Sequence, residues 1–89
     1  TVSVHGDPEF LFPYFSGFAD ETGTGPGLGL NVNLPLPLGT DDAGYRPALR
    51  VALGRVAAFR PAFVVVPFGT DGHEADPIGG FRLPAAFYS

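Results

Sequence analysis

The 89-residue sequence contains no cysteine and no lysine. Without cysteine the chain can form neither a disulfide nor a thiolate metal site, so any bound metal must be held by carboxylate and imidazole groups. Its five basic residues are scattered arginines, and nine acidic residues give a net charge of -4. Because no basic stripe can neutralise phosphates, the composition argues against nucleic-acid binding.

The sequence also lacks a long apolar run. No stretch approaches the roughly 18 apolar residues that span a bilayer, and no charged segment precedes an apolar core at its start. We therefore expect no membrane association and a cytoplasmic location. Hydrophobic residues make up 45% of the chain, with 13 glycines and 10 prolines, a composition that indicates a folded but loop-rich protein.

The patterning predicts three strands and one or two helices. Residues 1–5 and 30–34 alternate polar and apolar side chains as strands do, and Pro35 and Pro37 are expected to end the second strand. Capping residues in 39–42 precede an amphipathic pattern that reaches about Phe59, and Pro47 is expected in the first turn of this helix. The four apolar residues 63–66 predict a parallel strand covered on both faces. Residues 81–89 predict the beginning of a second helix.

The third predicted strand stops in a glycine-rich acidic turn that contains Asp71, His73 and Asp76. Ligands of parallel sheets bind beyond the carboxyl ends of the strands, which is the position of Asp71. Aspartate is also an ordinary turn former that caps backbone amides. The residues alone therefore leave two interpretations of Asp71 open, a ligand group and a structural cap.

A second candidate region is residues 9–18. It holds five aromatic residues without a helical or strand period, and Pro13 interrupts any regular element. Such a cluster forms a small core beneath a loop, or it lines a binding channel. The lone His5 before this loop is expected to be a hydrogen-bonded structural residue.

Several segments resemble, in the same order, the histone deacetylase and acetylpolyamine amidohydrolase superfamily, and most closely its acetylpolyamine amidohydrolase branch. The most specific is Gly69-Thr70-Asp71 followed by Asp76-Pro77-Ile78-Gly79, because the family's Gly-x-Asp supplies a zinc ligand and Asp-Pro-(Leu or Ile)-Gly follows it. The other segments are 3–8, 12–15, 17–23 and 30–36. The resemblance implies an α/β chain that is part of a three-layer αβα arginase/deacetylase-type fold with a parallel sheet. It also implies that residues 1–89 are a fragment of a single deacetylase-type catalytic domain, truncated at both ends.

The resemblance assigns roles to particular residues. Asp71 would be a ligand of Zn²⁺, and Ser3 and Val4 would contribute to a K⁺ site, although the Ser3 hydroxyl could equally cap a neighbouring backbone group. Phe12 and Ile78 would form opposite walls of the tunnel that admits an acetylated polyamine or an acetyl-lysine side chain.

The implied reaction is zinc-dependent removal of acetyl groups from acetylated amines. The family's catalytic histidine pair and tyrosine are expected outside residues 1–89, so the chain alone is predicted to bind zinc weakly and to hydrolyse nothing. His73 would lie behind the metal ligand or at the rim, and Asp76 would be a structural turn carboxylate. A non-enzymatic α/β binding module, or an inactive deacetylase-like fragment, is the alternative. The choice of polyamine or protein substrate, the metal used in the cell and a homo-oligomeric parent protein stay open.

Overall fold

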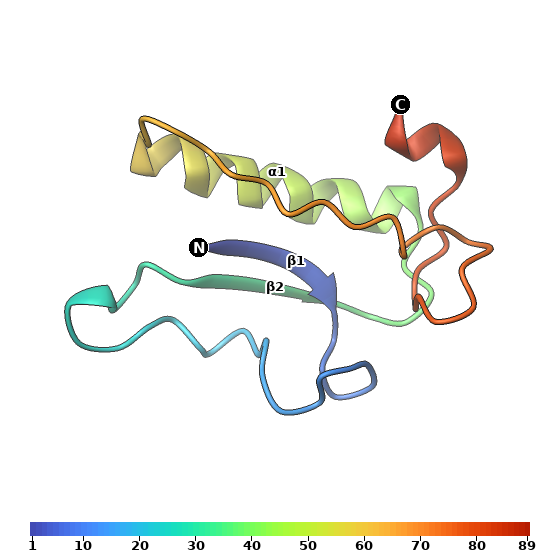
Figure 1. The fold of residues 1–89 in the computed structure, drawn as a ribbon, viewed down its shortest axis with the longest axis horizontal. Helices are drawn as coiled ribbons and strands as arrows, with labels where there is room; N and C mark the ends of the chain where they lie inside the picture. The colour runs from blue at the N-terminus through green and yellow to red at the C-terminus, as the bar shows by residue number, and fades with distance from the viewer.

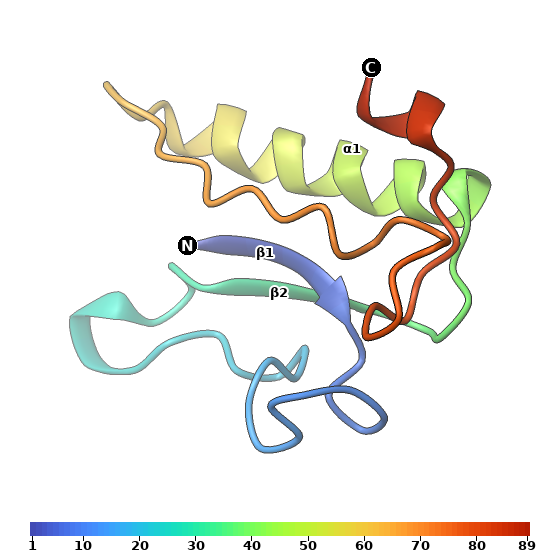
Figure 2. The same cartoon turned by 45° about the vertical axis from the view of Figure 1, so that its right-hand side comes forward.

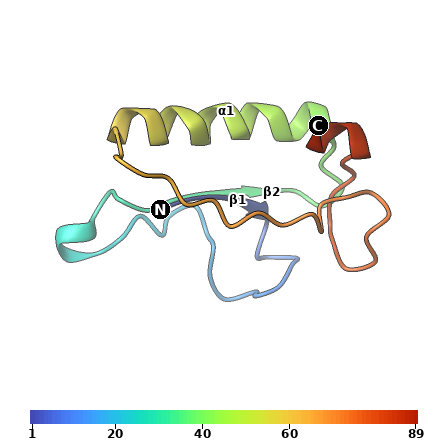
Figure 3. The same cartoon turned by 45° about the horizontal axis from the view of Figure 1, so that its top comes forward.

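The computed structural model describes all 89 residues. Strands β1 (Val2–Gly6) and β2 (Val32–Leu36) form a parallel sheet, and helix α1 (Asp42–Phe59) covers one face of it (Figure 1). Figure 3 shows α1 on one side of the sheet and the loop that follows β1 on the other. The α/β class and the parallel sheet expected from the sequence are therefore confirmed. The register pairs are Val2–Val32, Ser3–Asn33, Val4–Leu34, His5–Pro35 and Gly6–Leu36.

Pro35 lies inside β2, so the prediction that it ends the strand was wrong. The N–H of Val32 donates to the Thr1 carbonyl oxygen at 3.0 Å, and the Leu36 carbonyl oxygen accepts from the N–H of Asp7 at 2.8 Å. Alternate residues of β2 therefore direct their backbone groups to β1, and Pro35, between them, faces the open edge. A proline is tolerated there because no ladder hydrogen bond is required of it.

Helix α1 begins and ends with local caps. Its N-cap is Asp41, whose carboxylate accepts the N–H of Gly44 at 3.0 Å. Its C-cap is Arg60 in the left-handed conformation, with φ of 53°. The helix ends at Phe59 as predicted. The residues that cap it directly flank it in the sequence, so a local pattern is enough to predict its ends.

Pro47 does not lie in the first turn of α1, which corrects the prediction. The helix already begins at Asp42, so Pro47 lies inside it. The hydrogen bond that Pro47 cannot donate would have reached the carbonyl of Ala43, and both residues are exposed. Water can therefore solvate that carbonyl, which makes the loss tolerable so close to the helix start.

The third predicted strand, residues 63–66, is not formed. Figures 1 and 2 show this segment extended alongside β1, on the side away from β2. However, residues 61–69 make no backbone hydrogen bond, and the side chains of Phe63 and Val65 are 91% and 88% exposed. An apolar pattern indicates that a segment suits the interior of a sheet, but a strand forms only where a neighbouring backbone pairs with it.

The C-terminal residues form an extended segment followed by a short 3-10 helix, η2 (Ala85–Tyr88), rather than the predicted α-helix. The N–H of Arg82 donates to the Thr40 carbonyl oxygen at 2.9 Å, and the Leu83 carbonyl oxygen accepts from the N–H of Glu74 at 3.0 Å. These pairings hold the segment extended. Leu83 is 2% exposed and is one of three buried residues, the others being Ala52 and Pro8. No helix of the structure is both long and apolar enough to cross a membrane.

Candidate functional site

The loop that contains Asp71 lies at the carboxyl ends of β1 and β2. Its returning part is tied to the segment after β2, where the N–H of Gly39 donates to the Gly80 carbonyl oxygen at 2.6 Å. A Cβ built on Gly80 would lie 2.6 Å from Cδ1 of Leu11, in the loop after β1. The loops that follow the two strands therefore meet the Asp71 loop beyond the carboxyl ends of β1 and β2, which we call the carboxyl edge of the sheet (Figure 2).

The Asp71 carboxylate is exposed and makes no hydrogen bond within the chain. Its backbone, in contrast, is closely packed, because a Cβ on Gly79 would overlap the Asp71 carbonyl oxygen. A carboxylate that capped the turn would accept backbone amides. Asp71 accepts none, so its oxygens are free to bind a ligand while the backbone beneath them is held.

Asp76 performs the capping role in the same loop. One of its carboxylate oxygens accepts the N–H of Ile78 at 2.9 Å and of Gly79 at 2.8 Å. The hydrogen bonds from Gly79 and Ile78 lower the pKa of Asp76; burial opposes them to a smaller extent, and the nearby His73 makes the smallest contribution, which again lowers the pKa. Asp76 is therefore a structural turn carboxylate, as the sequence predicts.

Two tyrosines lie close enough to Asp71 to respond to its charge. Burial raises the pKa of Tyr45, and Tyr88 and Asp71 raise it further. Burial also raises the pKa of Tyr88, with additional contributions from Asp71 and Asp76. Both phenols therefore remain uncharged at neutral pH. The Tyr88 hydroxyl oxygen is buried and has no hydrogen-bond partner in the chain.

Aromatic contacts hold these tyrosines in place. Tyr45 packs edge-to-face against Phe87, with ring centroids 5.0 Å apart, and against Phe81 at 5.7 Å. The His73 ring stacks on Tyr88 at 6.5 Å, and its Nδ1 accepts the N–H of Ala75. The sequence assigned neither tyrosine to a site, because no local pattern indicates that the end of the chain returns to the Asp71 loop.

Phe12 and Ile78 are both displayed at this edge of the sheet. Their side chains are 81% and 85% exposed. Phe12 follows Leu11, which contacts Gly80, and Gly80 is close in sequence to Ile78. The structure thus joins the loops that carry the two residues. His73 lies in the same loop as Asp71.

Ser3 and Val4 lie in β1, away from that loop. The Ser3 hydroxyl is 2.7 Å from Nδ1 of His5, and Nε2 of His5 is 2.8 Å from the Gly17 carbonyl oxygen. The partner of the Ser3 side chain is therefore an imidazole rather than a backbone group. His5 has the hydrogen-bonded structural role expected from the sequence.

The residues present do not form a complete zinc site. No three His, Cys, Asp or Glu side chains of the chain lie close enough together to hold a metal ion. A protein zinc site, even an open catalytic one, requires three protein ligands. Asp71 could contribute one such ligand, and nothing else in residues 1–89 completes the set around it.

Comparison with known proteins identifies relatives of this sequence. The family described as "Histone deacetylase domain" matches residues 1–89. Acetylpolyamine amidohydrolase 2 of Pseudomonas aeruginosa is 44% identical over 87 residues, which are 98% of this chain and 25% of that protein. The acetylpolyamine amidohydrolase of Mycoplana ramosa is also 44% identical over 87 residues, covering 98% of this chain and 26% of that protein.

Solved structures show the same similarity in three dimensions. An acetylpolyamine aminohydrolase from Burkholderia pseudomallei matches with a TM-score of 0.90 and 40% identity, over 93% of this chain and 24% of that one. An HDAC homologue crystallised with SAHA matches with a TM-score of 0.93 and 35% identity, over 98% of this chain and 24% of that one. The chain thus spans about a quarter of the length of the curated relatives it matches.

Proposed function

Because this chain belongs to the histone deacetylase family, we propose that it is one part of a single catalytic domain that hydrolyses acetylated amines, with Asp71 as a zinc ligand. The relatives at 44% identity support an acetylpolyamine as the substrate, and an acetyl-lysine side chain presents the same acetamide on an aliphatic amine. The chain matches about a quarter of the length of these relatives, so the activity of the whole protein is part of the proposal.

The single observation that carries the proposal is the state of the Asp71 carboxylate. Asp76 performs the turn-capping role in this loop, so the structure provides no local reason for a carboxylate at position 71. A free carboxylate on a closely packed backbone at the carboxyl edge of a parallel sheet is suited to hold a ligand. The other zinc ligands would come from outside residues 1–89, and bound zinc would act as a Lewis acid on the acetyl carbonyl.

The substrate would be held between the loops that meet at this edge. We place Phe12 and Ile78 on opposite walls of a tunnel, because both are exposed and their loops are joined through Leu11 and Gly80. Apolar walls suit the aliphatic chain of an acetylated amine. His73 would lie at the rim. Ser3 and Val4 would contribute to a K⁺ site, in which the Ser3 hydroxyl would be shared with His5.

The test is a chimera in which residues 1–89 replace the matching segment of the Pseudomonas aeruginosa amidohydrolase. We expect this chimera to hydrolyse an acetylated polyamine in a zinc-dependent manner. Asp71→Asn should lower kcat/KM at least about 100-fold, the upper end of the loss seen when only groups behind a metal ligand are changed. Zinc content, measured by mass spectrometry, should fall in parallel.

The matched control is Glu74→Gln, which removes a charge from the same loop. The Glu74 side chain is exposed and makes no hydrogen bond, so activity should stay within about twofold of the chimera, as is usual for surface changes. An Asp71→Asn chimera that retains its zinc and its activity would exclude Asp71 as a ligand. A folded chimera without metal or turnover would favour a non-enzymatic module.

A further inference from the structure

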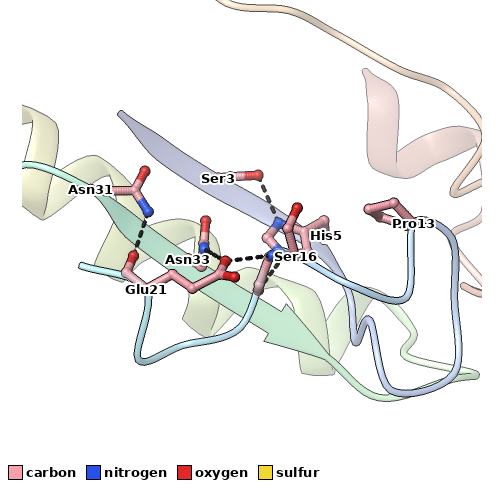
Figure 4. Close-up of a pocket in the computed structure, with 8 residues that line it drawn as sticks. Ser3, His5, Pro13, Ser16, Glu21, Asn31 and Asn33 are labelled. Carbon is pink, nitrogen blue, oxygen red and sulfur yellow. Dashed lines mark hydrogen bonds between the residues drawn. The ribbon is translucent and has the colours of Figure 1, made fainter. Parts of the chain in front are cut away.

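A polar recess of about 370 Å³ lies on the face of the sheet opposite α1 (Figure 4). Neither Asp71 nor the tunnel residues Phe12 and Ile78 line it, and its only member proposed for a site is Ser3, at the K⁺ site. Apart from the Pro13 ring its lining side chains are polar, and they come from β1, from the start of β2 and from the loop between them. The lining residues are Ser3, His5, Pro13, Ser16, Gly17, Glu21, Asn31 and Asn33.

Glu21 is the central acceptor of this recess. One oxygen of its carboxylate accepts the N–H of Gly17 at 2.6 Å and of Phe18 at 3.1 Å, and the side-chain amide of Asn33 in β2 at 3.2 Å. Hydrogen bonds to an ionised acceptor are stronger than neutral ones. The carboxylate therefore holds the backbone of residues 17–18 against β2.

The carbonyl groups of the same two residues are held from the strands. His5 Nε2 is 2.8 Å from the Gly17 carbonyl oxygen, so this nitrogen carries the proton, and Asn33 donates to the Phe18 carbonyl oxygen at 3.0 Å. A Cβ on Gly17 would lie 2.7 Å from His5 Nε2, and the φ of Gly17 is +105°. Only glycine fits such a conformation and such a close approach.

Residues 17–18 are the end of the loop 9–18 that carries five aromatic residues, here called the aromatic loop. The other end is held at Leu11. Its side chain packs so closely on Gly6 that a Cβ there would overlap it. Between these two fixed points, Phe12, Tyr14 and Phe15 are 81%, 62% and 78% exposed. The loop therefore presents its rings without packing them into a core, and its position depends on its two ends.

We propose that Glu21 is a positioning residue that fixes the aromatic loop so that Phe12 keeps one place in the substrate tunnel. The inference rests on the proposed function, in which Phe12 contacts the substrate chain. Glu21 lies behind the loop and acts through Phe12, so its removal should weaken binding of the substrate chain more than it slows the chemical step.

The test is a double-mutant cycle in the active chimera. Glu21→Ala should raise KM for the acetylated polyamine about tenfold, the factor that corresponds to roughly 1.4 kcal/mol, and should change kcat less than about twofold. In a Phe12→Ala background the same substitution should change KM less than about twofold, because the residue it positions is gone. Hydrogen exchange of the Gly17 and Phe18 amides should become faster in both backgrounds.

Asp20→Asn is the control, since this neighbouring carboxylate is exposed and makes no hydrogen bond, and it should leave KM unchanged. Glu21→Gln keeps an acceptor oxygen and should give an intermediate KM; if Glu21→Ala does not fold, this variant decides the question in the same cycle. If Glu21→Ala changed kcat and KM by the same factor, with Phe12 present and absent alike, Glu21 would only stabilise the fold, and the inference would be overturned. An inactive parent chimera would overturn the proposed function as well, whereas an active one with unaltered KM in the Glu21 variants overturns this inference alone.

Discussion

At the scale of single residues, the carboxylates of the Asp71 loop differ in what their oxygens contact. Asp76 accepts two backbone amides, and Asp71 accepts none. Both are aspartates in one short loop, but only Asp76 is followed by a proline, and this position predicted a structural turn role for it. The structure confirms this turn role of Asp76. The role of Asp71 as a zinc ligand stays a prediction.

Gly79 is the residue that holds the Asp71 backbone in place. Gly79→Ala would drive a methyl group into the Asp71 carbonyl oxygen, a backbone atom that cannot turn aside. We expect the free energy of unfolding of the chimera to fall by about 1–3 kcal/mol, the usual range for overpacking, and its zinc content to fall with it. Urea unfolding and metal analysis measure both.

Gly27→Ala is the comparison for this experiment. A Cβ on Gly27 meets nothing within 4 Å, so its effect on stability should stay within about 0.5 kcal/mol, as for other surface substitutions. If the two alanine variants were equally stable and equally loaded with zinc, the close packing of Gly79 on Asp71 would have no consequence.

At the scale of elements, α1 is the element that the sequence predicts best, and a glycine in its interior lowers its stability. Gly54 lies in the interior of the helix, and a Cβ there would meet nothing within 4 Å. Gly54→Ala should stabilise the 89-residue chain by about 0.5–1 kcal/mol, because glycine loses more backbone entropy than alanine on entering a helix. Far-UV circular dichroism during thermal unfolding measures the gain.

Gly44→Ala provides the matched comparison in the same helix. Its Cβ would lie 3.1 Å from Cγ2 of Thr40, within the N-terminal cap region, so its gain should be smaller than that of Gly54→Ala. A loss of helicity in the Gly54 variant would show that the face of α1 around position 54 is in contact with something else.

At the scale of the whole molecule, the chain buries little of itself. Only three of its 89 residues are buried, while Phe63, Val65 and Phe68 are among many large apolar side chains left exposed. A chain of this size has a small core to set against its conformational entropy. We therefore expect the isolated chain to have low stability and to bind the dye ANS through its exposed apolar surface.

The isolated chain is also expected to lack activity. One free carboxylate without converging ligands should bind zinc no more tightly than about 1 mM, which corresponds to roughly -4 kcal/mol. Isothermal titration with zinc, followed by an acetylpolyamine hydrolysis assay of the same sample, measures both properties. Turnover by the 89 residues alone would contradict the view that the remaining ligands come from elsewhere.

By itself the sequence determined the elements whose causes lie within a few residues. Helix α1 followed from its caps and periodicity, β1 and the first part of β2 followed from their alternation, and the family followed from the order of short motifs. Only the tertiary structure decided which side of β2 faces its partner, and therefore why Pro35 is tolerated. It also decided that residues 63–66 have no pairing strand, and that Glu21 holds Gly17 and Phe18. These contacts depend on which backbone or carboxylate the fold places next to a given segment, and no short stretch of sequence indicates that.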